Sequence, residues 1–287
     1  MFGIFKILRL TRGFLVLSRE KDLIPENLIR SLPAPIKIFL KVIPSNKKSD
    51  LSESLQKLGP TWIKMGQFLS TRPDIIGNKL SIHLRGLQDS LPPFDKKHVE
   101  QAFIESFGED YKKKFKKIDE PIAAASIAQV HKAIIKSDGK SQTVAVKILR
   151  PNIEGKIKKD LNDFYLAAKI LEKFSSEARR LRVLEVVKTL EESLSMEVDL
   201  RLEAAAQSEI IDNTKNDDFI EIPKIFWDLT SKNILTTQWV NSHSSKDLIK
   251  IKKKNINFNS VGENIMKTFL ILAIRDGFFH ADMHQGN

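Results

Sequence analysis

The chain has 287 residues, of which 41% are hydrophobic, and this content is enough to fill a core and excludes a chain that is disordered overall. It contains no cysteine, which excludes a disulfide scaffold, a thiolate metal site and a cysteine nucleophile. The 47 Lys and Arg residues outnumber the 36 Asp and Glu residues and give a net charge of +11, which favours an anionic partner such as nucleic acid, nucleotide phosphate or anionic lipid.

The N-terminal segment predicts a basic amphipathic helix, because apolar side chains and arginines fall on opposite arcs at about 100° per residue. The apolar positions are Ile4, Ile7, Leu10, Phe14 and Leu17, the arginines are Arg9, Arg12 and Arg19, and Lys6 lies at the boundary. Such a helix could lie on an anionic bilayer, act as a transit peptide or dock its apolar face on the rest of the protein. No apolar run approaches the ~18 to 20 residues of a membrane-spanning helix, so we predict no membrane span.

Helical spacing dominates the sequence up to about residue 115. One helix is predicted over 28–43. A second begins at Gly59-Pro60, where proline suits the first turn of a helix, and ends before Pro73. These segments predict a helical N-terminal region.

Residues 115–150 have a strand-like pattern instead. Two strands are predicted over 127–135 and 143–149, and the turn signal Ser137-Asp138-Gly139 separates them. We therefore expect these two strands to form a hairpin.

A long helical stretch is predicted over 153–211, and two strand candidates follow at 219–227 and 233–240. Beyond a polar, lysine-rich segment, residues 261–274 predict an apolar helix, and the sequence then reads FFHADMHQGN. The order of hairpin, long helix, strand pair, helix and polar loop is that of a protein-kinase small lobe followed by the start of a large lobe.

Three polar residues strengthen this interpretation. Lys147 of the VAVK run stands on the second hairpin strand, where a kinase places the lysine that holds the nucleotide phosphates. Asp282 and Asn287 have the spacing of the kinase catalytic loop, in which the Asp accepts or orients a proton and the Asn binds magnesium. VAVK alone also occurs in strands whose lysine is merely solvated, but its place in this order favours the kinase interpretation.

An alanine-rich segment stands where a kinase carries its glycine-rich loop. The segment contains Ala123, Ala124, Ala125 and Ser126. Glycine permits positive φ and close backbone approach to phosphates, whereas a Cβ restricts both. We therefore expect a mode of nucleotide handling that differs from that of an ordinary kinase.

With KMGQ at 64–67 and EVD at 197–199 added, the chain resembles the UbiB family of aarF-domain atypical kinases from about residue 51 onward. The stretches that carry the resemblance are LGPTWIKMGQFLSTRPDIIG, LQDSLPP, AAASIAQVH, VAVKILRP, EVDLRLEA and FFHADMHQGN. It implies an α+β fold with a helical extension over 1–115, a kinase-like small lobe over 116–243 and an incomplete helical large lobe over 244–287.

The resemblance also implies a function. The implied protein is an atypical kinase or ATPase that uses ATP and Mg²⁺ to support the biosynthesis of ubiquinone or another prenyl lipid. The resemblance favours ATP hydrolysis over protein phosphorylation. The implied partners are a nucleotide, an anionic membrane surface or prenyl lipid, and quinone-biosynthesis enzymes, and the implied location is cytoplasmic and peripheral at the inner membrane. Nucleic-acid binding is not expected, because no recognition motif is present. The alternative is a catalytically inactive scaffold that binds lipid or biosynthetic partners.

By matching motifs, the resemblance assigns individual roles. The catalytic residues are Asp282, Lys64, Gln67, Glu197 and Asp199, the nucleotide-binding residues are Ala123, Ala124, Ala125, Ser126, Lys147 and Glu203, and the magnesium ligand is Asn287. Glu197 is expected to pair with Lys64 and Glu203 with Lys147. On one ideal helix the two glutamates lie about 120° apart, which suits two different partners. The structural alternative is a solvated lysine at 64 and an ordinary charged helix around Arg201.

The sequence also departs from the family. Gln238 stands where an acid usually precedes the interlobe hinge, and Ser242 replaces a common glycine. The sequence stops at Asn287, before the metal-binding DFG aspartate and the C-terminal membrane segment of the family. We therefore expect a C-terminally truncated form, either a fragment of a longer protein or the product of a split or decaying gene.

Overall fold

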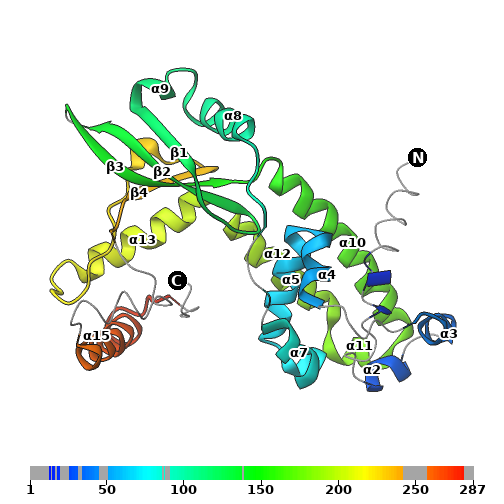
Figure 1. Ribbon diagram of the computed structural model, residues 1–287. Helices are drawn as coiled ribbons and strands as arrows, with labels where there is room; N and C mark the ends of the chain where they lie inside the picture. The colour runs from blue at the N-terminus through cyan, green and yellow to red at the C-terminus, as the bar shows by residue number, and fades with distance from the viewer. Residues whose placement is uncertain are drawn as a thin grey trace. The chain divides into compact units, whose positions relative to one another are not determined.

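The computed structural model describes residues 13, 15–16, 18–19, 26–31, 34–44, 51–85, 87, 91–137, 139–241 and 257–280 (Figure 1). The chain forms two compact units, each built from three stretches of sequence. The first unit comprises Met1–His98, Ala123–Gln129 and Leu149–Val198, and the second comprises Val99–Ile122, Val130–Ile148 and Asp199–Asn287.

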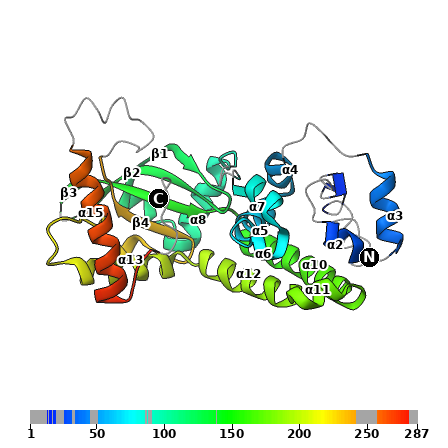
Figure 2. The ribbon, with the colours of Figure 1, turned by 90° about the horizontal axis from the view of Figure 1, so that it is seen from below.

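The first unit is helical. Its helices are α2 (Glu26–Ser31), α3 (Ala34–Val42), α4 (Leu51–Leu58), α5 (Pro60–Ser70), α6 (Pro73–Ile76), α7 (Asn78–Arg85), α10 (Ile153–Phe174), α11 (Ser176–Leu181) and α12 (Val183–Glu197). Helices α10 and α12 run side by side (Figure 2), and α5 packs on both. The rings of Trp62 and Phe164 meet in a T-shaped contact at a centroid distance of 4.8 Å, which packs α5 against α10.

The second unit contains most of a four-stranded sheet. The strands are β1 (Phe115–Ala124), β2 (Ala128–Ser137), β3 (Lys140–Leu149) and β4 (Ile234–Gln238), in that spatial order. Strands β3 and β4 are antiparallel, and Lys147 lies opposite Leu235. Because side chains alternate along a strand, the fully buried Val146 and Ile148 point away from the face that carries Lys147.

Helices complete the second unit. They are α8 (Lys96–Phe107), α9 (Tyr111–Lys114), α13 (Leu200–Thr214), the short turn η2 (Trp227–Leu229), α15 (Phe258–Leu270) and the π-helical turn η3 (Ile271–Asp276). Helix α13 lies against β4 and covers one face of the sheet (Figure 1). Phe103 of α8 is fully buried and meets Phe115 at a centroid distance of 4.8 Å.

Several sequence predictions are confirmed. The fold is mixed α+β, the second predicted helix corresponds to α5, and the hairpin corresponds to β2 and β3, with Gly139 in the left-handed region at φ +76°. The absence of a membrane span stays a prediction for the whole chain; within the described ranges, no helix combines the length and the apolar character of a membrane span. The division into an extension, a small lobe and a large lobe stays a prediction.

Three predicted elements are wrong in extent. The helix over 28–43 is two helices, since Pro35 suits the first turn of α3 and not a helix interior. The strand over 219–227 reduces to one bridge between Ile225 and Thr237, because Pro223 lacks an N–H donor and a 3₁₀ turn follows.

The long helix over 153–211 is four helices, α10 to α13, because capping residues interrupt it. Ser175 has extended backbone, and its hydroxyl accepts a hydrogen bond from the Ala178 amide at 3.1 Å. Arg182, between α11 and α12, has a φ of +51°. Asp199 has extended backbone and forms the N-cap of α13.

Candidate functional site

The ion pair between Lys147 and Glu203 joins the sheet to α13 within the second unit. Lys147 Nζ lies 2.9 Å from Oε1 and 2.8 Å from Oε2 of Glu203, so both carboxylate oxygens accept from the ammonium group. The side chains are 32% and 47% exposed, which leaves room for an anion to reach the lysine. The predicted pairing is confirmed, whereas the role of the pair in nucleotide binding stays a prediction.

Asp199 forms the N-cap of α13, one turn before Glu203. Its carboxylate accepts from the Arg201 amide at 3.1 Å and from Nε and Nη2 of Arg201 at 2.9 and 2.6 Å. The side-chain hydrogen bond from Arg201 lowers the pKa of Asp199, although burial opposes this shift. Asp199 therefore fixes the start of the helix that presents Glu203.

This cap corrects one sequence expectation. Glu197 is the last residue of α12 and Glu203 belongs to α13, so the two glutamates do not share one helix. The predicted angle of about 120° between Glu197 and Glu203 around one helix is therefore wrong, because the extended backbone of Asp199 separates the two helices. The expectation of two separate partners is nevertheless right.

The first unit holds the second predicted ion pair. Lys64 Nζ of α5 lies 2.7 Å from Oε2 of Glu197, and the Lys64 side chain is only 17% exposed. Gln67 follows one turn later on α5 and is half-buried. The pairing is confirmed, and the catalytic roles of these three residues stay predictions.

Gly66, between Lys64 and Gln67, has a packing reason that the sequence did not reveal. A Cβ at this position would lie 2.7 Å from Leu87 Cδ2 and 2.9 Å from Leu55 Cδ1. Only a residue without a side chain lets α5 sit this close to the leucines of the first unit.

The alanine-rich loop belongs to the first unit. Ala123 and Ala124 end β1, and the Ala125 amide donates to the Ala128 carbonyl at 2.8 Å to close the turn. Ser126 at the turn is fully buried. Among the described non-glycine residues, positive φ occurs at Asn152 and Arg182 and not in this loop. The loop thus turns without the left-handed backbone that glycine permits.

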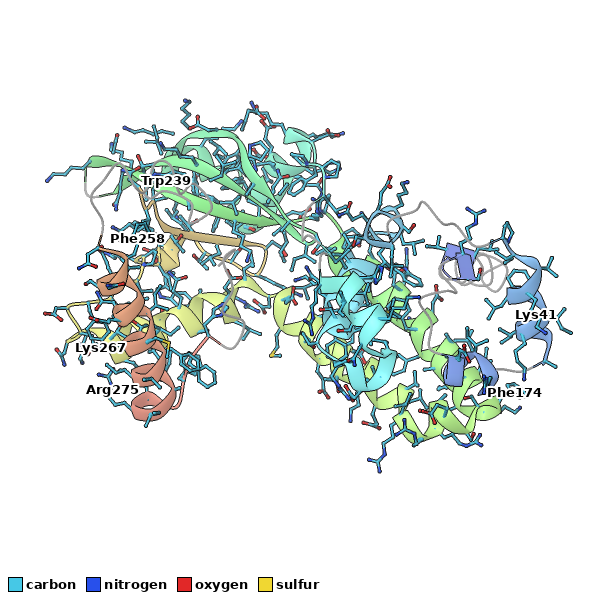
Figure 3. All side chains as sticks on the ribbon, turned by 60° about the horizontal axis from the view of Figure 1, so that its bottom comes forward. Lys41, Phe174, Trp239, Phe258, Lys267 and Arg275 are labelled. Atoms are coloured by element: carbon cyan, nitrogen blue, oxygen red, sulfur yellow. The ribbon has the colours of Figure 1, made fainter. Side chains whose placement is uncertain are left out.

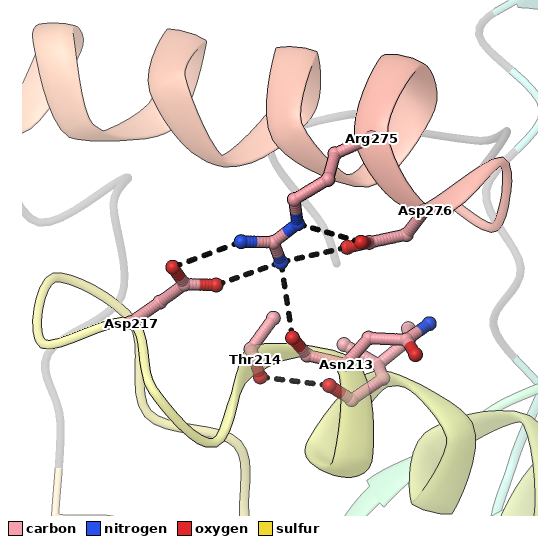
Figure 4. A network of polar contacts seen from close by, with 6 residues as sticks. Asn213, Thr214, Asp217, Arg275 and Asp276 are labelled. Carbon is pink, nitrogen blue, oxygen red and sulfur yellow. Dashed lines mark hydrogen bonds and ion pairs between the residues drawn. The ribbon is translucent and has the colours of Figure 1, made fainter.

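Arg275 makes a polar cluster in the second unit that sequence reasoning missed. Its guanidinium lies between Asp217 and Asp276 and also donates from Nη2 to the Asn213 carbonyl at 3.0 Å (Figure 4). Hydrogen bonds from Arg275 lower the pKa of Asp276. Lys267, on the same helical run (Figure 3), lies 3.9 Å from the centroid of the Phe219 ring. The two cations tie α15 and η3 to the end of α13.

Some predicted site residues lie outside the part of the chain that the structure describes. The site residues are Asp282 and Asn287, and Ser242 and all predicted N-terminal helix positions except the exposed Arg19 lie outside that part as well. Within the described ranges, no group of three or more His, Asp or Glu side chains is arranged to hold a metal ion. The amide oxygen of Asn287 is a donor of the type that Mg²⁺ prefers.

Two further polar side chains of the second unit, those of His131 and Gln238, have structural partners. His131 is buried on β2, with Nδ1 2.7 Å from the Asp119 carbonyl oxygen. Gln238 ends β4, and its Oε1 accepts from the Lys224 amide at 3.2 Å. Both contacts agree with structural roles at these positions.

A strand lysine held by both oxygens of a carboxylate, from a helix that covers the sheet, is the arrangement of a protein-kinase small lobe. The fold and this pair therefore define a kinase-like protein. Residues 86–287 match the family described as the ABC1 atypical kinase-like domain. The chain belongs to this family of UbiB-type atypical kinases.

The curated relatives agree with this assignment. The chain is 37% identical over 268 residues to the probable protein kinase UbiB of Marinobacter nauticus, covering 90% of this chain and 48% of that protein. It is 37% identical over 235 residues to the protein of the same name from Pseudomonas aeruginosa, covering 82% of this chain and 44% of that protein. The chain thus spans about half the length of the curated relatives it matches.

Proposed function

We propose that this protein binds ATP with Mg²⁺ and acts as an atypical kinase or ATPase that supports ubiquinone or other prenyl-lipid biosynthesis at a membrane surface. The observation that carries the proposal is the bidentate contact between Lys147 and Glu203. The carboxylate holds the ammonium group above the sheet, where a lysine of a kinase meets nucleotide phosphates. Family membership supports the remainder of the proposal.

Each site residue has a role in this proposal. Lys147 binds phosphate oxygens and Glu203 orients it, and the alanine-rich loop is a second nucleotide-binding element that acts through its backbone. Asp282 orients the attacking hydroxyl or water, and Asn287 holds Mg²⁺, which neutralises charge on the phosphates when bound. Lys64, Gln67, Glu197 and Asp199 complete the predicted catalytic set.

Calorimetric titration with MgATP tests the nucleotide step. We expect Lys147→Met to weaken binding at least tenfold, because it removes the cation and keeps most of the length of the unbranched side chain. Lys136→Met is the matched control, since Lys136 is an exposed lysine on the neighbouring strand β2, and it should leave affinity unchanged. If Lys147→Met and Lys136→Met bound MgATP with equal affinity, the role of Lys147 in nucleotide binding would be refuted. If the unmodified protein did not bind MgATP, the result would favour the scaffold function.

Co-sedimentation with vesicles tests the membrane step. We expect binding to vesicles with anionic lipid, falling as salt rises, since exposed charges are screened beyond roughly 8 to 10 Å at physiological ionic strength. Removal of residues 1–19 should weaken this binding. If the protein bound neutral and anionic vesicles equally, both with and without residues 1–19, the N-terminal segment would have no role in membrane binding.

A further inference from the structure

The guanidinium group of Arg150 is bound to the alanine-rich loop. Arg150 comes directly after β3, and its Nε and Nη2 donate to the Ala125 carbonyl at 3.1 and 2.7 Å. Nη2 also lies 3.4 Å from the Leu91 carbonyl, and the guanidinium carbon lies 5.7 Å from the centroid of the Phe94 ring. The Arg150 amide donates to the Ile127 carbonyl at 2.8 Å. One residue therefore holds the loop by both its side chain and its main chain.

Gln129 fixes the other end of the loop. Its side chain is almost fully buried, its Oε1 accepts from the Phe94 amide at 2.9 Å, and its Nε2 donates to the Phe94 carbonyl at 3.4 Å. The Leu91 amide also lies 3.4 Å from the Ala124 carbonyl. The loop is thus tied at several points to the segment 91–94, and all of these residues belong to the first unit.

These contacts restrict the alanine-rich loop, whereas a glycine-rich phosphate-binding loop has more backbone freedom. Hydrogen bonds from a charged donor are stronger than those between neutral groups, and two of them end on one carbonyl oxygen. The alanines add no left-handed backbone conformations of their own. A loop held in this way has little conformational freedom with which to adjust its backbone to a ligand.

We propose that Arg150 and Gln129 are positioning residues that hold the alanine-rich loop in one conformation against residues 91–94. The consequence for nucleotide binding rests on the function proposed above. Neither residue needs to contact the nucleotide, because each acts through the backbone of the loop. The signal in the sequence is the arginine that directly follows VAVKIL, together with the glutamine of AAASIAQVH.

Amide hydrogen exchange in the absence of nucleotide tests the proposal directly. We expect Arg150→Gln to raise the exchange rate of the Ala125 amide at least tenfold, because its bond to the Ala128 carbonyl depends on the shape of the turn. The matched control is Arg179→Gln, since Arg179 Nη1 also donates to two main-chain carbonyls, those of Glu172 and Lys173, at 2.7 and 3.2 Å. The control should leave exchange in the loop unchanged. Unchanged exchange in a folded Arg150→Gln protein would overturn the proposal.

Nucleotide affinity supplies a readout that a merely structural role would not move. Ala125→Gly should tighten MgATP binding, and the gain should be at least threefold larger in the Arg150→Gln background, because Arg150 holds the carbonyl of residue 125. Additive effects of the two substitutions would also overturn the proposal. If the unmodified protein fails to bind MgATP, the proposed function is wrong, and the exchange measurement alone then decides whether Arg150 positions the loop.

Discussion

Lys64 on α5 and Glu197 at the end of α12 form an ion pair of 2.7 Å in which the lysine side chain is largely removed from solvent. A half-buried ammonium group that loses its carboxylate keeps its desolvation penalty without the compensating attraction. Removing one partner of this pair should therefore cost more than removing one partner of an exposed pair of the same length.

The first prediction compares this pair with an exposed one. Glu197→Gln removes the carboxylate charge that faces Lys64 and should lower the free energy of unfolding by roughly 1–3 kcal/mol. Glu53→Gln breaks the 2.7 Å pair with Lys57, whose side chains are 62% and 67% exposed, and should cost at most about 1 kcal/mol. Urea denaturation of both variants measures the difference. Equal losses would show that burial of the Lys64 pair has no energetic consequence.

The second prediction concerns the pH dependence of the Asp199 cap. Because the pKa of Asp199 is lowered in the folded protein, its stabilising contribution is present above the ordinary Asp range and is lost as the pH falls through the lowered value. Asp199→Asn keeps a capping oxygen but loses the charge, so it should be less stable than the unmodified protein at pH 7 and should approach it in stability as the pH falls through the lowered pKa of Asp199. Thermal unfolding across this pH range measures the convergence.

Two further variants complete the pH experiment. Asp199→Ala removes the cap as well and should lose about 1 kcal/mol more than the asparagine variant at every pH. Asp110→Asn is the control, because the Asp110 side chain is 77% exposed in its pair with Lys113. A stability gap between Asp199→Asn and the unmodified protein that stays constant down to pH 2 would contradict the assigned role of the charge.

The sequence predicted the parts of the site that depend on local pattern. The position of Lys147 follows from the VAVK run on the second strand of the predicted hairpin, and the start of α5 follows from Gly59-Pro60. The break between α12 and α13 was missed, because Asp199 lies inside a continuous helical pattern of apolar residues and its capping role depends on backbone geometry. The bonds of Arg150 and Arg275 to distant carbonyls were also missed, since neither hydrophobic period nor motif spacing reports contacts between a side chain and remote main chain.

The third prediction tests the Arg275 cluster. Arg275→Lys keeps the charge but loses the planar fork that meets Asp217 at 3.1 and 2.9 Å and Asp276 at 2.6 and 2.9 Å. We expect faster amide exchange along α15 and η3, because the bonds from this side chain to Asp217 and Asn213 hold that run to the end of α13. The control is Arg180→Lys, whose fork to Glu177 lies within α11. Slow exchange preserved in α15 of the Arg275 variant would assign the attachment to Lys267 and apolar packing instead.

The last prediction compares two glycines that both lie inside helices. Gly66→Ala places a Cβ within 3 Å of Leu87 and Leu55, and this overpacking costs about 1–3 kcal/mol against a gain of roughly 1 kcal/mol in helix propensity. At Gly262, on the exposed face of α15, a Cβ would have nothing within 4 Å, so Gly262→Ala should gain about 0.5–1 kcal/mol without a clash. Calorimetry should therefore show a lower melting temperature for Gly66→Ala and a higher one for Gly262→Ala. If both substitutions raised the melting temperature, close packing of α5 on the leucines would not be the reason for glycine between Lys64 and Gln67.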